Sequence, residues 1–337
     1  MDAATTFVED SLNGVIWNLV PWFLVAAGVY FGLRTLFVQI RMVPDMFKAV
    51  SERPKGKDRD GRDLDEDYGG LSAFKAFTIS AASRVGTGNI AGVALAISIG
   101  GPGAVFWMWM LALLGGATAF VESTLAQLWK TKDSDGNYHG GPAYYMTRGL
   151  GWKPLAVIFS AFLAVTYGFV YNAIQTNSIA EAVGGSLGSD SVALKAVVAG
   201  VIAVLTALII FGGVTRIASW TQVIVPFMAG AYILIGIAVV VINWREIPGM
   251  VELIVGHAIG LEQVAGAGVG AAFAQGMRRG LFSNEAGMGS APNAAATATV
   301  SHPAKQGLVQ TLGVYFDTLV VCTITAFIIL LGPEIAY

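Results

Sequence analysis

Apolar residues run along this chain in long blocks, and polar residues collect in the short stretches between them. About eight blocks are long enough to cross a bilayer as helices, which requires roughly 20 apolar residues each. None alternates apolar and polar residues with the period of a membrane-spanning strand. The pattern therefore predicts an all-α polytopic membrane protein. The predicted spans are 15–37, 74–100, 104–129, 154–180, 193–213, 219–244, 264–300 and 308–332.

The composition agrees with this pattern. Of the 337 residues, 55% are hydrophobic and only 12% are charged, whereas soluble domains carry about 25% charged residues. The net charge of −2 gives no basic field of the kind that binds nucleic acid. The expected surrounding is therefore a lipid bilayer, no nucleic-acid partner is indicated, and protein partners stay unknown.

Lysine and arginine are distributed unevenly over the loops. The loop 41–70 is rich in both, and Arg216 and Lys305 lie in later loops on the same side of the predicted bundle. Loops rich in these residues face the cytoplasm. The sequence therefore predicts a multi-pass protein of the cell membrane (plasma or inner membrane), with a cytoplasmic 41–70 loop and an outside N-terminus.

The span 74–100 contains the polar, glycine-rich stretch Gly-Thr-Gly-Asn at 86–89. A dinucleotide-binding turn of similar spelling needs a preceding strand and an acid about 20 residues later, but the next acid here is Glu122. Irregular backbone inside a membrane survives only where it lines a protein-buried cavity. The stretch therefore predicts a broken helix with free N–H and C=O groups. A straight helix packed through its glycines is the alternative.

A second interruption, Ser-Asn-Glu at 283–285, lies in the span 264–300. Charged residues are costly at this depth, so Glu285 is expected to pair with Arg278 or Arg279 or to face a wet cavity. The two interrupted spans occupy corresponding positions in halves that cross the membrane in opposite directions. Such a pair is the sequence sign of an inverted-repeat transporter whose binding site lies at the breaks.

Three motifs resemble the alanine or glycine:cation symporter family. They are VGTGNIAGVALAISIGGPGAVFWMWMLALLGGATAFVESTLAQLW, GGPAYYM and RRGLFSNEAGMGSAPNAAATA. The resemblance implies one transporter domain, 1–337, with a leucine-transporter (LeuT) type inverted-repeat helix bundle. Its implied parts are an extra N-terminal helix at 15–38, a first five-helix repeat at 71–243 and a partial second repeat at 264–337. Because the second repeat holds fewer than five helices, the resemblance also implies a chain truncated at its C-terminus.

The resemblance implies sodium-coupled symport of small neutral amino acids, alanine or glycine, into the cell by alternating access. Na⁺ is then the coupling ion, and no organic cofactor is expected. Proton-coupled or other small-solute transport on the same fold stays open, as does an ion channel, a different class. The chain shows no recognisable arrangement of nucleophile and base, so an enzyme is not expected.

The same resemblance implies where the substrate binds. Its carboxylate is expected at the first break, where Thr87 and Gly88 offer backbone N–H groups. Gln175 resembles a position that lines the pocket, and hydrogen bonding between helices is its alternative role. An aromatic wall at Phe282 would admit alanine or glycine more readily than leucine. The implied substrate-binding residues are Thr87, Gly88, Gln175, Phe282, Ser283 and Asn284.

For sodium, the resemblance implies the backbone carbonyls of Ala82 and Val85, with Asn89 at a neighbouring cation site. Hard cations prefer oxygen ligands, which an unwound helix supplies. Asp317 lies near the middle of its span. It either adds negative charge to the cation site or pairs with an arginine, and intramembrane acids are functional by default.

Overall fold

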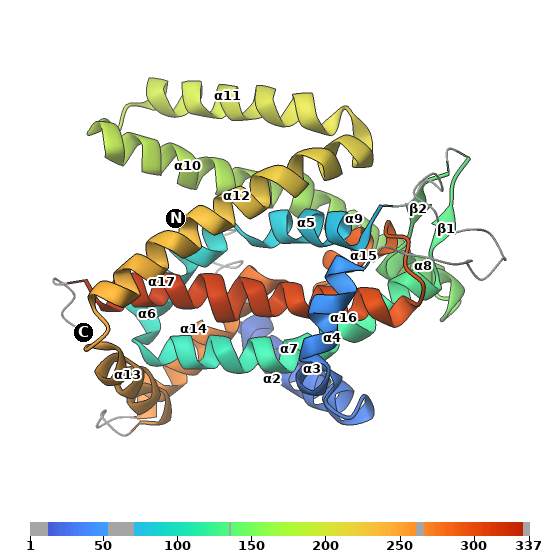
Figure 1. Cartoon of the computed structure of the whole chain (residues 1–337). Helices are drawn as coiled ribbons and strands as arrows, with labels where there is room; N and C mark the ends of the chain where they lie inside the picture. Colours follow the sequence, from blue (N-terminus) through green and yellow to red (C-terminus); the bar gives the residue numbers. More distant parts are fainter. Residues whose placement is uncertain (1–12, 53–70, 135, 261–265, 333–337) are drawn as a thin grey trace.

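The computed structural model describes residues 13–52, 71–134, 136–260 and 266–332 (Figure 1). The helices begin with α2 (Asn13–Arg34), α3 (Val38–Arg41), α4 (Val43–Ser51), α5 (Ala73–Arg84), η2 (Gly88–Gly92), α6 (Val93–Gly100), α7 (Gly103–Leu128), α8 (Pro142–Arg148), α9 (Lys153–Val165), η3 (Thr166–Val170) and α10 (Tyr171–Leu187). They continue with α11 (Val192–Ile210), α12 (Gly213–Ile242), α13 (Ile247–Ile259), α14 (Gly266–Asn284), α15 (Ala291–Ala296), α16 (Pro303–Tyr315), η4 (Phe316–Cys322) and α17 (Thr323–Leu330). The segments labelled η are π-helical turns within longer helices.

The described residues depart from an all-α structure in two places, a short hairpin and an isolated bridge between Leu71 and Ala298. After α7 the chain forms a two-stranded antiparallel hairpin, with β1 (Thr131–Lys132) paired to β2 (Tyr138–His139). The pairing is short because only two residues of each strand take part. The hairpin lies in a loop between predicted spans, so the helical class of the protein is unchanged.

Six helical segments of the described residues are long and apolar enough to cross a membrane. They are Asn13–Arg34, Gly103–Leu128, Lys153–Leu187, Val192–Ile210, Gly213–Ile242 and Pro303–Leu330. The other two predicted spans, 74–100 and 264–300, are the two in which the sequence predicted a break, and both are interrupted. The chain is therefore a multi-pass membrane protein, and the interruptions explain why six continuous helices stand where eight spans were expected.

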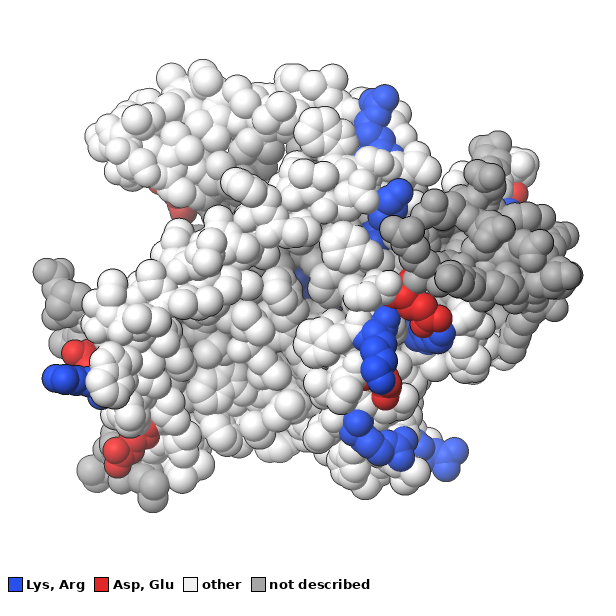
Figure 2. All heavy atoms as spheres, viewed as in Figure 1, with Lys and Arg blue, Asp and Glu red and all other residues white. Residues whose placement is uncertain are grey.

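Charged side chains on the face shown in Figure 2 gather mainly towards the two ends of the long helices, with a wide uncharged belt between them. One end carries Arg34 at the end of α2, Arg216 at the start of α12 and Lys305 at the start of α16. Along the belt, α11 contains no buried residue. Apolar side chains exposed in this way are stable next to lipid tails, so the belt marks the part of the molecule that lies in the bilayer.

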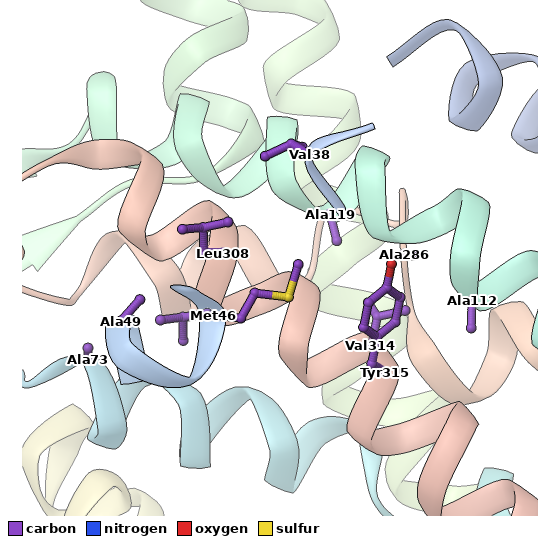
Figure 3. Close-up of a cluster of buried hydrophobic side chains, with 11 residues drawn as sticks. Val38, Met46, Ala49, Ala73, Ala112, Ala119, Ala286, Leu308, Val314 and Tyr315 are labelled. Carbon is purple, nitrogen blue, oxygen red and sulfur yellow. The ribbon is translucent and has the colours of Figure 1, made fainter. Parts of the chain in front are cut away.

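Helix α7 is the centre of the bundle and packs against α2, α13, α14, α15 and α16. The crossing with α16 is close because Gly307 has no side chain: an added Cβ would lie 2.7 Å from the Phe120 carbonyl oxygen. Small residues permit such close approaches between membrane helices. Figure 3 shows the apolar cluster beside this crossing, where Met46 of α4 and Tyr315 of α16 lie near Ala119 of α7. This packing fixes the helices that carry the two breaks.

Candidate functional site

The first predicted break is present between α5 and η2. In a continuous α-helix the N–H of Gly86 would donate to the carbonyl of Ala82, but here it donates to Oδ1 of Asn89 at 2.8 Å. The N–H of Asn89 donates to the Gly86 carbonyl at 3.2 Å instead of to Val85. The carbonyls of Ala82 and Val85, which were predicted to bind Na⁺, are therefore released from the partners they would have in a regular helix.

The second predicted break is also present, between α14 and α15. Glu285 adopts a left-handed conformation with φ of 55°, and Gly287 and Gly289 follow with φ of 85° and 76°. Glycine adopts such angles without steric cost, whereas glutamate does so rarely. The side chain of Asn284 stabilises the turn, because its Oδ1 accepts the N–H of Ala286 at 3.0 Å.

Asn89, Ser283 and Asp317 meet where the two breaks face η4. The amide Nδ2 of Asn89 donates to Oδ1 of Asp317 at 2.6 Å and to Oγ of Ser283 at 3.0 Å. Ser283 and Thr318 in turn donate to Oδ2 of Asp317 at 2.7 and 3.0 Å. No Lys or Arg nitrogen of the described residues lies within 4.0 Å of the Asp317 carboxylate. Asp317 thus lies beside Asn89, a residue predicted at a cation site, and is not paired with an arginine of the described residues.

Two π-helical turns, η2 and η4, meet at this junction, and a third, η3, lies on the helix that carries Gln175. They carry Asn89 (η2), Tyr167 (η3) and Asp317 (η4). In η4 the wider turn brings Cys322, five positions after Asp317, to the same face, where its sulfur lies 3.2 Å from Oγ of Ser283. π-Helical turns are rare and are frequent at functional sites. The clustering of these turns marks the junction as the candidate site.

Gln175 reaches the first break from α10. Its Oε1 accepts the backbone N–H of Thr87 at 3.1 Å, and a Cβ added to Gly86 would lie only 2.6 Å from its Nε2. Gln175 therefore lies beside the residues predicted to hold the substrate carboxylate. The hydrogen bond between helices, which was the alternative role for this side chain, is also present.

Phe282 lies against the first break from the other side. A Cβ added to Gly88 would lie 3.2 Å from Cδ1 of Phe282. The Phe282 ring stacks on Tyr171, with centroids 5.2 Å apart, and Tyr171 stacks on Tyr167 at 4.8 Å. Three aromatic rings thus form a continuous wall beside Gly88. The wall leaves little room for a large side chain on any molecule that binds at the first break.

The model of the sodium:alanine symporter family matches residues 1–336 of the chain. The chain belongs to this family. It is 54% identical over 316 residues to the amino-acid carrier protein AlsT of Bacillus subtilis, which covers 94% of the chain and 64% of AlsT. It is 47% identical over 319 residues to the probable sodium/glutamine symporter GlnT of the same organism, covering 94% and 64%. The sodium/alanine symporter AgcS of Methanococcus maripaludis is 39% identical over 327 residues, covering 95% and 69%. The chain therefore spans slightly less than two thirds of the length of AlsT and GlnT.

One predicted residue of this family member is placed differently from the others. Both polar atoms of the Asn284 side chain have partners within the scaffold, since Nδ2 donates to Oγ1 of Thr318 at 3.2 Å and Oδ1 accepts the Ala286 N–H. Asn284 thus connects the second break to η4, and its hydrogen bonds do not involve Thr87 or Gly88. A role for Asn284 in substrate binding stays a prediction.

Glu285 was expected to pair with Arg278 or Arg279 or to face a wet cavity, and of these alternatives the ion pair is wrong. The Glu285 carboxylate accepts hydrogen bonds from the hydroxyls of Ser83 and Ser290. The guanidinium of Arg278 lies over the Trp17 ring, 5.4 Å from its centroid. Residues 278 and 279 precede the end of α14, whereas Glu285 lies beyond it in left-handed conformation, so the turn directs its side chain towards α5.

Sequence reasoning missed two contributors to the symporter-family site. Thr318 directly follows Asp317, so adjacency is a signal that was present in the sequence. Cys322 carried no such signal, because helical periodicity aligns residues three or four apart. Its position beside Asp317 depends on the π-helical turn η4, which the sequence pattern did not indicate.

Proposed function

We propose that this chain carries a small neutral amino acid, alanine or glycine, into the cell together with Na⁺. The observation that carries the proposal is the buried junction of Asn89, Ser283 and Asp317, at which both helix breaks meet. Membership of the sodium:alanine symporter family supports it, as does the name of AgcS, a sodium/alanine symporter. GlnT is named a probable sodium/glutamine symporter, so family membership alone does not select the amino acid, and the space at the site does.

The sodium ion takes its place at Asp317 in this proposal. A buried carboxylate without a charged partner is costly, and a bound cation removes that cost. The oxygens beside the Asp317 carboxylate are the hydroxyls of Ser283 and Thr318, and we propose that the released carbonyls of Ala82 and Val85, at the end of α5, complete the site. A hard monovalent cation prefers such oxygen ligands. Asn89 orients the Asp317 carboxylate through its amide.

The amino acid lies beside the ion, at the first break. Thr87 and Gly88 begin the helical segment after the break, where backbone N–H groups favour a carboxylate. Gln175 offers its amide to the same end of the substrate. The stacked rings of Phe282 and Tyr171 limit the space for a side chain beside Gly88. This limit favours alanine and glycine over larger amino acids.

We also propose the architecture that the family resemblance implies. It is a LeuT-type inverted repeat of about eight spans, with an extra helix at 15–38, a first repeat at 71–243 and part of a second at 264–337. Two broken helices at corresponding positions support it. The N-terminus is placed outside and the loop 41–70 in the cytoplasm, although residues 1–12 and 53–70 lie outside the described part of the chain.

Coupling follows from the shared position of the two ligands. The ion at Asp317 and the amino acid at Thr87 both contact the backbone of the first break. Binding of one fixes the break in the geometry that the other requires, so the loaded site favours reorientation across the membrane. The inward sodium gradient then drives uptake of the amino acid against its own gradient.

Uptake by proteoliposomes tests the proposal. The chain is reconstituted and radiolabelled alanine uptake is recorded with an inward sodium gradient, then with potassium in place of sodium. The same assay is run on a chimera in which the part of AlsT beyond the matched region continues the chain. Sodium-dependent uptake by either preparation, abolished by Asp317→Asn, is the expected result. Uptake that is equal in sodium and potassium, or unaffected by Asp317→Asn, contradicts the sodium role.

A further inference from the structure

Glu285 is a buried carboxylate that the proposed function leaves without a role. Only 1% of the residue is exposed. Oγ of Ser83 lies 3.0 Å from both of its carboxylate oxygens, and Oγ of Ser290 lies 2.5 Å from Oε2. No Lys or Arg nitrogen in the described part of the chain lies within 4.0 Å of it. The carboxylate is therefore solvated by neutral hydroxyl groups and has no cationic partner in contact.

The surroundings of Glu285 are separate from those of Asp317. Asp317 accepts hydrogen bonds from Asn89, Ser283 and Thr318, and none of these side chains bonds to Glu285. Glu285 faces α5 through Ser83, whereas Asp317 faces η2. The two carboxylates can therefore hold their ligands independently.

A cavity of about 490 Å³ reaches the Glu285 cluster. Ser83, Ser290 and Tyr167 all line it, while apolar residues of α5, α9 and α12, such as Ile79, form much of the remaining wall. The hydroxyl of Tyr167 is buried and lies beside the side chains of Ser290 and Glu285. Three hydroxyl groups thus lie around Glu285 at a cavity large enough to admit a small hydrated solute.

The charge balance of the interior favours the binding of cations beside the buried carboxylates. The buried charged residues of the described chain are Arg84, Glu122, Glu285 and Asp317. One guanidinium therefore faces three carboxylates, and Arg84 itself reaches towards α16, where its Nη1 lies 3.5 Å from the Gln310 carbonyl. Uncompensated buried charge is strongly unfavourable. A single sodium ion at Asp317 still leaves one negative charge in excess.

We propose that Glu285, together with Ser83, Ser290 and Tyr167, forms a second site for a monovalent cation. This inference rests on the proposed symport, which places the first cation at Asp317. A carboxylate with hydroxyl oxygens suits a sodium ion, and the same oxygens accept the N–H groups of an alkylammonium. The cation at this site is therefore either a second Na⁺ or the ammonium group of the bound amino acid. Binding measurements distinguish these two cases.

The test measures ²²Na⁺ binding to the full chain in lipid nanodiscs without amino acid. Wild type is compared with Glu285→Gln, Asp317→Asn and the double variant. Glu181→Gln is the matched control, because Glu181 is an exposed carboxylate on α10. If the second cation is sodium, each single variant retains about half of the bound Na⁺ and the double variant retains none. The control binds as wild type does.

If the cation is the substrate ammonium, Glu285→Gln leaves Na⁺ binding intact but weakens alanine binding at least about tenfold, as expected for a lost charge-assisted hydrogen bond. Binding of lactate, which has a hydroxyl in place of the ammonium, then stays the same. Either result supports the site. Glu285→Gln that changes neither Na⁺ stoichiometry nor alanine affinity by more than about twofold overturns it.

Two further measurements keep the test decisive. If Glu285→Gln does not give a monodisperse protein, Ser290→Ala combined with Tyr167→Phe replaces it, because these changes remove ligand oxygens without altering charge. The expected loss is the same in kind. If Asp317→Asn binds sodium normally and Glu285→Gln binds less sodium, the Glu285 site is supported and the proposed Asp317 site is contradicted. A failure of the proposed function can therefore be told apart from a failure of the second cation site.

Discussion

Nδ2 of Asn89 lies 2.6 Å from Oδ1 of Asp317, although 228 positions separate the two residues in the chain. The contact joins the first helix break to the π-helical turn η4. Because the same amide also reaches Ser283 at 3.0 Å, one side chain fixes the relative positions of three elements. Changes at Asn89 are therefore expected to act on the ion through the orientation of Asp317.

Asn89→Ala is expected to weaken sodium binding, so that uptake requires a higher sodium concentration. A hydrogen bond to a charged group contributes about 1.5–3 kcal/mol, which corresponds to roughly a 10- to 100-fold higher sodium concentration at half-maximal uptake. The measurement is alanine uptake as a function of sodium concentration. Asn172→Ala serves as the control, since Asn172 is exposed and bonds only to backbone carbonyls of its own helix. An unchanged sodium dependence in Asn89→Ala contradicts the assigned role.

Gly88→Leu is expected to abolish uptake while leaving the protein folded. The new side chain must occupy space next to Phe282 and Ser283, where even a Cβ meets atoms at 3.2 and 3.3 Å. Gly200→Leu is the matched control, because a Cβ there has no neighbouring atom within 4 Å. Uptake and the size-exclusion profile are measured for both. Normal uptake by Gly88→Leu would refute a substrate position at this break.

Gln175→Ala is expected to weaken alanine binding rather than folding. The change removes the amide that contacts the charged end of the amino acid in the proposed mode, and a hydrogen bond to a charged group contributes about 1.5–3 kcal/mol. We expect KM for alanine to rise by roughly 10- to 100-fold, with a smaller effect on the thermal midpoint from the lost hydrogen bond to the Thr87 N–H. Uptake kinetics and a thermal melt of the purified protein check both parts. A lower midpoint with unchanged KM indicates that Gln175 only joins the helices.

Phe282→Ala is expected to broaden the choice of substrate. Removing the ring opens space beside Gly88 and breaks the stack with Tyr171, which contributes about 0.5–1.5 kcal/mol beyond burial. Leucine, which competes poorly with alanine for the wild-type chain in this view, should then inhibit labelled alanine uptake. Competition curves for alanine, leucine and glutamine in both proteins measure the change. Identical competition curves for the two proteins would show that the Phe282 ring does not limit the size of the substrate side chain.

Gly307→Leu is expected to prevent folding, in contrast to the changes at the site. Its Cβ would lie 2.7 Å from the Phe120 backbone oxygen, which cannot move away as a flexible side chain can. Overpacking of this kind costs about 1–3 kcal/mol or more. The yield of monodisperse protein is the measurement, and Gly230→Leu, with no atom within 4 Å of the added Cβ, is the control. Equal yields would show that α7 and α16 can separate.

The amino-acid order alone determined much of the candidate site. Glycines and polar residues inside apolar spans indicated both breaks, because only a buried cavity tolerates irregular backbone within a bilayer. The same reasoning singled out Asn89 and Asp317, since polar groups at that depth require partners. Both breaks are present in the structure, and these two residues are in contact.

The tertiary structure determined which side chains the buried polar groups contact. Glu285 was expected to pair with Arg278 or Arg279 or to face a wet cavity, but its left-handed backbone directs it to Ser83, a residue 202 positions away. Cys322 joins the site because η4 is wound more widely than an α-helix. Local sequence records the periodicity and polarity of one helix at a time. It does not record the angle at which a broken helix restarts, and that angle sets which distant side chains meet.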